Sequence, residues 1–80
     1  MEWSEVQELN EYHHNRCIIS QTPLGTFIIK WNGLYKKIEY YLFLGDVFIG
    51  KYEYLDDAKK AAKEHIIDMA AKLNRYIETF

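Results

Sequence analysis

The side chains best suited to chemistry in this sequence are three histidines and a cysteine. His13 and His14 stand just before Cys17, and His65 follows much later in the chain. Imidazole and thiolate groups are zinc ligands, but zinc sites usually combine two closely spaced pairs, and here the second pair is missing. We therefore expect no metal site and interpret the histidines as surface residues. Cys17 lies in a β-prone run without a neighbouring base, which indicates a packed thiol rather than a nucleophile.

Other catalytic patterns are also missing from the sequence. The carboxylates show no pairing that would identify a general acid and base. Gly25, Gly33, Gly45 and Gly50 are spaced as turn and strand glycines and do not cluster as in a phosphate-binding loop. We therefore expect neither enzymatic activity nor a cofactor, and look for a function in binding.

Composition narrows the class of partner. A net charge of −2 and a pI near 5.9 argue against a general nucleic-acid binder. Two Trp, seven Tyr and four Phe are more rings than a domain of 80 residues can bury, so some should face a protein partner or a second copy of the chain.

The sequence also leads to an expectation about the cellular location of the protein. The single cysteine excludes an internal disulfide and suits a reducing cytosol. No apolar run has the length of a membrane span, and the acidic N-terminus differs from a signal peptide. We expect a complete cytoplasmic protein with one domain over residues 1–80 and no membrane partner.

The last third of the chain predicts a long amphipathic helix over residues 54–80. Eight residues recur at steps of three and four, within about ±40° of one line at roughly 100° per residue. This stripe is predicted to lie on a sheet, and consists of Leu55, Ala58, Ala62, Ile66, Met69, Leu73, Tyr76 and Phe80. Ile67 projects about 140° from the stripe. It is either an ordinary surface residue or a helix contact across a homodimer.

Residues 1–14 predict a short N-terminal helix, from about residue 4 to residue 12. Ser4-x-x-Gln7 has the pattern of a capping box, and Trp3, Val6 and Leu9 recur at steps of three. The acidic residues of this segment include Glu5, Glu8 and Glu11. Runs of charge are usually solvated faces, although this one could also attract a basic partner.

Residues 15–52 predict an antiparallel meander of three or four strands. The runs 16–20, 26–31, 37–44 and 47–51 are β-prone and are separated by turn residues. The C-terminal helix should cover one face of this sheet. The other face should carry Tyr41 and Phe43, with Tyr52 and Tyr54 nearby, and we predict that it binds a partner. The expected fold is therefore α+β, with a short N-terminal helix, the antiparallel sheet and the long helix packed on one face.

The element order also resembles that of double-stranded RNA-binding domains. Those domains place lysines at the start of the last helix, and Lys59, Lys60 and Lys63 stand in that region here. Asp56 and Asp57 in the first turn would repel phosphate. This resemblance therefore implies an outline of the fold rather than its function.

A second resemblance covers about residues 13 to 67. The runs TPLGTFIIKW, YYLFLGDVFIG and LDDAKKAAKEHI are similar to a layout of small phage and prophage proteins. In those proteins a T-P-x-G turn leads a strand that ends in an aromatic residue, a hairpin follows, and a Leu-acid-acid-Ala-Lys helix closes the chain. The resemblance implies an accessory protein that blunts host defences, as anti-CRISPR proteins do, by occupying the nucleic-acid-binding or catalytic surface of a host complex. It carries over no site residue.

Three functional hypotheses follow. The first is a stoichiometric inhibitor of a host defence nuclease, which would bind a host protein or ribonucleoprotein complex. The second is a nucleic-acid-binding module that uses the helix lysines with Tyr41 or Phe43, and the third is a binder that sequesters a nucleotide signal. The candidate binding residues are Glu5, Glu8, Glu11, Tyr41, Phe43, Tyr52, Tyr54 and Ile67.

Overall fold

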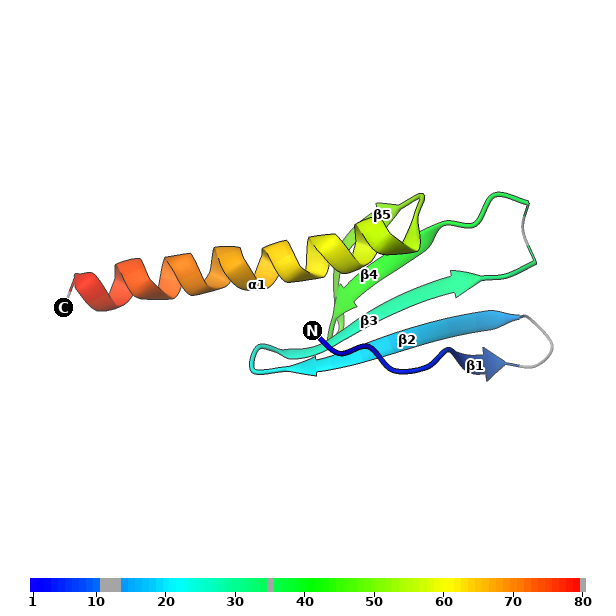
Figure 1. Ribbon diagram of the computed structural model, residues 1–80, viewed down its shortest axis with the longest axis horizontal. Helices are drawn as coiled ribbons and strands as arrows, with labels where there is room; N and C mark the ends of the chain where they lie inside the picture. Colours follow the sequence, from blue (N-terminus) through cyan, green and yellow to red (C-terminus); the bar gives the residue numbers. More distant parts are fainter. Residues whose placement is uncertain (11–13, 35, 80) are drawn as a thin grey trace.

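The computed structural model has an α+β fold, in which a five-stranded antiparallel sheet precedes one C-terminal helix (Figure 1). It describes residues 1–10, 14–34 and 36–79. The strands follow one another across the sheet in chain order. The elements are β1 (Gln7–Asn10), β2 (Asn15–Thr22), β3 (Gly25–Asn32), β4 (Tyr40–Leu44), β5 (Val47–Tyr52) and α1 (Leu55–Glu78).

The N-terminal segment forms an edge of the sheet, so the predicted N-terminal helix is wrong and the strand count is five rather than three or four. The Ser4 amide donates to the Ile19 carbonyl at 2.8 Å, and the Ser4 hydroxyl accepts from the Ile19 amide at 3.0 Å. Ser4 therefore pairs with β2 and does not cap a helix. Trp3 packs against the core. A helix this short is marginal by itself, whereas the sheet edge satisfies backbone groups and leaves the indole partly buried against the core.

Two of the predicted turns are confirmed as tight hairpins. The first joins β2 to β3 and is fixed by the Thr22 hydroxyl, which donates to the Gly25 carbonyl at 2.8 Å. The second joins β4 to β5 through Gly45, whose φ of 57° suits glycine. After Asn32 the chain enters a longer connection, since β4 begins only at Tyr40.

The core lies between α1 and the face of the sheet that carries the buried residues of β3. Phe27, Ile29 and Trp31 alternate along β3 as predicted and pack with Ala58 and Ala62 of the helix. The small alanine side chains let the helix axis approach the strands closely. This face is called the helix-side face below.

Only the first half of α1 rests on the sheet. Ala58 and Ala62 are buried, whereas the side chains of Leu73 and Tyr76 are 51% and 62% exposed. The helix of 24 residues is roughly 36 Å long. The longest strands have eight residues and span roughly 26 Å. The predicted apolar stripe therefore continues past the end of the sheet (Figure 1), and the molecule measures 53 × 20 × 19 Å.

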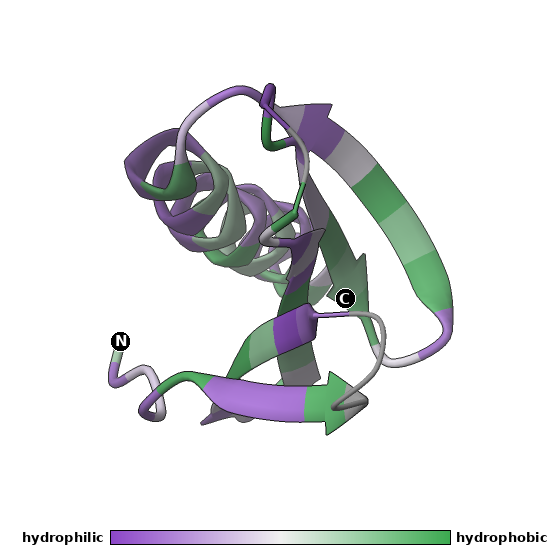
Figure 2. Cartoon of the chain, turned by 90° about the vertical axis from the view of Figure 1, so that its right-hand side faces the viewer, coloured by the Kyte–Doolittle hydropathy of each residue, from purple (hydrophilic) through white to green (hydrophobic). Residues whose placement is uncertain are grey.

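The strands curve around α1, as the view along the molecule shows (Figure 2). The helix contacts β3, β4 and β5 from the inside of this curve. Within residues 1–10, 14–34 and 36–79, no helix is both long and apolar enough to cross a membrane.

Candidate functional site

The face of the sheet turned away from α1, called the open face below, carries a continuous row of apolar side chains. Directly paired residues of neighbouring strands project to the same face. The register pairs Ile19 with Ile28, Ile28 with Phe43, and Phe43 with Phe48. These four residues, from β2 to β5, are called the apolar row. Phe48 is 54% exposed, and its ring centroid lies 5.5 Å from that of Phe43.

A second row of the open face adds positive charge. The same register aligns Cys17, Lys30, Tyr41 and Lys51, called the lysine row below. The Lys30 ammonium lies 5.1 Å from the centroid of the Phe43 ring, in a cation–π contact that joins the two rows. Tyr41 is 37% exposed, with its ring centroid 6.3 Å from that of Phe48. The open face is therefore an aromatic surface bordered by lysines.

Glu39 fixes one end of the lysine row. The Tyr41 hydroxyl donates to its Oε2 at 2.9 Å, and Lys51 Nζ lies 3.5 Å from its Oε1. The hydrogen bond from Tyr41 lowers the pKa of Glu39 below the ordinary value of 4.5; Lys51 and Lys37 also lower it, while desolvation opposes them. Glu39 is thus ionised near neutral pH and compensates the charge of Lys51.

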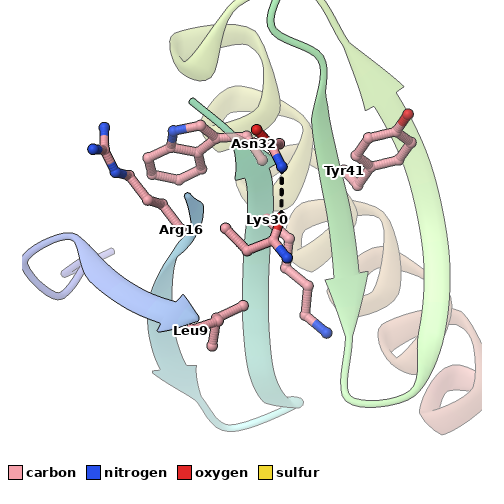
Figure 3. A pocket seen from close by; sticks show the side chains of 7 residues that line it. Leu9, Arg16, Lys30, Asn32 and Tyr41 are labelled. Atoms are coloured by element: carbon pink, nitrogen blue, oxygen red, sulfur yellow. Dashed lines mark hydrogen bonds between the residues drawn. The ribbon is translucent and has the colours of Figure 1, made fainter. Parts of the chain in front are cut away.

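A pocket of about 350 Å³ opens beside the lysine row (Figure 3). Leu9 rises from β1 on one side, and Tyr41 stands on β4 on the other. Arg16 contributes to the lining, but its guanidinium points away from Tyr41. The full lining consists of Leu9, Asn15, Arg16, Lys30, Trp31, Asn32 and Tyr41.

The aromatic residues named from the sequence separate into two groups. Tyr41 and Phe43 share the open face. Tyr52 packs against the core on the helix-side face, where its hydroxyl group would lie 2.8 Å from a Cβ added to Gly50. Tyr54 is exposed at the start of α1, away from both rows.

The glutamates and Ile67 lie elsewhere. Glu5 is exposed, and Glu8 Oε1 lies 3.9 Å from Arg16 Nη2, opposite Arg16 on the edge strand. Arg16 pairs with Trp31, so this ion pair belongs to the helix-side face. Glu11 lies outside the described residues. Ile67 is exposed on α1, so the structure does not bring the acidic residues, Ile67 and the aromatic rows into one site.

The helix lysines are also separated from the open face. Lys59, Lys60 and Lys63 belong to α1, which packs on the helix-side face, whereas Tyr41 and Phe43 project from the other face of the sheet. A single nucleic-acid site that combines the two groups does not match this arrangement.

The sequence analysis did not identify Phe48 and Lys51 as residues of the open face. Strict alternation along β5 would put these two residues on opposite faces. A β-bulge shifts the register between the Phe43–Phe48 and Leu42–Gly50 pairs, so both project from the open face. The glycine in this strand was the available signal, because glycine within a strand often marks a bulge.

The metal-ligand types do not form a cluster in the described part of the chain. Cys17 is buried, His14 is exposed, and His65 contacts Phe27 edge-on at 6.0 Å on the helix-side face. His13 is outside the described residues. Among residues 1–10, 14–34 and 36–79, no three histidine, cysteine or acidic residues are arranged to hold a metal ion.

Comparisons of the chain with protein-family models, curated proteins and solved structures find no match. The function must therefore be argued from the surface itself.

Proposed function

We propose that this chain is a non-catalytic module that binds a protein partner through its open face. The observation that carries the proposal is the apolar row, four side chains aligned by register across β2 to β5. Phe48 is exposed, and Ile19, Ile28 and Phe43 are partly exposed. Aromatic residues that lie together on a surface are typical of binding hot spots. Lys30 at the border, which forms no ion pair with a described carboxylate, would favour a partner with complementary charge.

The partner we propose is a host protein or ribonucleoprotein complex of a defence nuclease, which the chain would inhibit stoichiometrically. This part rests on the resemblance to small phage proteins. Since Glu5 and Glu8 lie on the N-terminal edge, they would affect the rate of association, while the apolar row would supply the affinity.

The geometry favours protein over nucleic acid at this face. The rings of Tyr41 and Phe43 are tilted by 43° and 59° against that of Phe48, so the three do not form a set of parallel stacking surfaces. Lys30 lies over the Phe43 ring and would have to move before a base could stack there. Proteins that bind single strands instead offer free aromatic faces to successive bases.

Affinity capture of the tagged chain from a bacterial lysate with intact defence systems tests this proposal, with nuclease treatment in parallel. Phe48→Ala removes an exposed ring of the apolar row. Val47→Ala is the matched control, since Val47 is also exposed but pairs with Leu44, which packs against the core. We expect one stoichiometric, nuclease-resistant complex with the wild type and Val47→Ala and its loss with Phe48→Ala. Capture that needs intact nucleic acid, or that survives Phe48→Ala, would contradict the proposal.

A further inference from the structure

We infer that the pocket beside the lysine row receives a carboxylate of the partner, so that the partner presents an acidic residue next to apolar ones. This inference rests on the proposed function and adds the chemistry of the docking segment. It depends on which polar groups in the pocket are already used and which are left over.

The orientation of two amide groups can be read from their hydrogen bonds. The Leu34 amide donates to Asn32 Oδ1 at 2.9 Å, which leaves Asn32 Nδ2 as the donor to Asn15 Oδ1 at 3.0 Å (Figure 3). The Asn15 side chain must then present its NH₂ group elsewhere. In the described part of the chain this group has no acceptor, and Asn15 lines the pocket.

Among the described strand residues, Lys30 is the cation whose charge no described carboxylate compensates. Arg16 lies 3.9 Å from Glu8, and Lys51 lies 3.5 Å from Glu39. No carboxylate of residues 1–10, 14–34 and 36–79 lies within ion-pair distance of Lys30. Lys30 lines the pocket on an exposed, flexible stem, so its ammonium can turn from the Phe43 ring to an anion bound there.

These leftover groups are donors and one of them is a cation, and a carboxylate is the protein side chain that only accepts hydrogen bonds and carries the opposite charge. Leu9 and the ring of Tyr41 give the pocket apolar walls, which suits an acidic side chain beside apolar neighbours. Successive rows of the open face are two residues, or about 7 Å, apart along the strands. The pocket is lined by Lys30 and Tyr41 of the lysine row and by Asn15 and Asn32 of the next row, so it lies about 7 to 14 Å from the apolar row. One partner segment can therefore occupy both.

Selection from a library of displayed random dodecapeptides tests the inference. Lys30→Gln removes the charge, and Asn15→Asp keeps the acceptor for Asn32 but replaces the free donor with an anion. Lys51→Gln is the matched control, since it alters an exposed lysine of the same row that Glu39 already compensates. We expect the wild type and Lys51→Gln to enrich peptides with Asp or Glu beside apolar residues. Lys30→Gln and Asn15→Asp should bind those peptides roughly tenfold or more weakly.

Enriched peptides without acidic residues, or acidic peptides that bind both pocket variants as well as the wild type, would overturn the inference. A selection in which the wild type enriches no peptides beyond those enriched by Phe48→Ala would also overturn the inference. A separate titration with an oligouridylate tests phosphate as the ligand. If the oligouridylate binds the wild type and binds Lys30→Gln more weakly, the pocket binds phosphate instead of a carboxylate. The lysate capture separates the two claims: if Phe48→Ala abolishes capture while acidic peptides are not preferred, the proposed function stands and the carboxylate site is wrong.

Discussion

At the scale of single residues, the open face is organised by Glu39, which accepts a hydrogen bond from Tyr41 and pairs with Lys51. The sequence placed Tyr41 and Phe43 on a face away from the helix, because alternation along β4 separates them from Leu42. It could not show that Tyr41 and Lys51 would meet at Glu39. That arrangement depends on the register of β4 against β5, which the bulge shifts.

Tyr41→Phe is expected to raise the pKa of Glu39 toward its ordinary value, because the Tyr41 hydrogen bond is the largest cause of the lowering. A carboxyl with a lowered pKa in the folded state stabilises the fold above its unfolded pKa, and this contribution is lost as the pH falls through the folded pKa. In Tyr41→Phe this contribution should therefore be smaller, and its loss below pH 4.5 should be complete at a higher pH than in the wild type. Carboxyl NMR titration would measure the shift, with Tyr40→Phe as control. An unchanged Glu39 pKa in Tyr41→Phe would show that the hydrogen bond is not formed.

At the scale of elements, the sequence predicted those parts whose pattern is governed by burial. The start of α1 and the alternation of Phe27, Ile29 and Trp31 along β3 are confirmed, because both bring apolar side chains to one core. The first strand was missed because Trp3, Val6 and Leu9 at steps of three fit a helix, and edge pairing leaves little trace in a sequence. The prediction that the helix contacts the sheet along its full length is also wrong, because the periodicity of apolar residues does not reveal how long the sheet is.

Because α1 extends beyond the sheet, alanine substitutions of two leucines should differ in their effect on the free energy of unfolding. Leu42 is fully buried, so Leu42→Ala should lower the free energy of unfolding by about 2 to 5 kcal/mol. Leu73 is half-exposed beyond the sheet, so Leu73→Ala should change it by less than about 0.5 kcal/mol. Urea unfolding at several protein concentrations would measure both. A large, concentration-dependent cost for Leu73→Ala would show that a second copy covers this part of the helix.

At the scale of the whole molecule, the aromatic composition predicted that some rings must face outward, and the structure places three of them together on the open face. The identity of the partner is not encoded in a single chain, because complementarity belongs to two surfaces. The chain does provide two isoleucines that probe the open face and two that serve as internal controls. Ile19 and Ile28 lie on the open face, while their neighbours Ile18 and Ile29 are buried on the helix-side face.

Methyl NMR of the isoleucine-labelled chain with its captured partner is therefore the most direct test of protein binding at the open face. We predict that the partner shifts or broadens the methyl signals of Ile19 and Ile28 and leaves those of Ile18 and Ile29 nearly unchanged. Shifts confined to Ile67 and Ile77 on α1, with Ile19 and Ile28 unaffected, would contradict the assignment and transfer the interface to the helix.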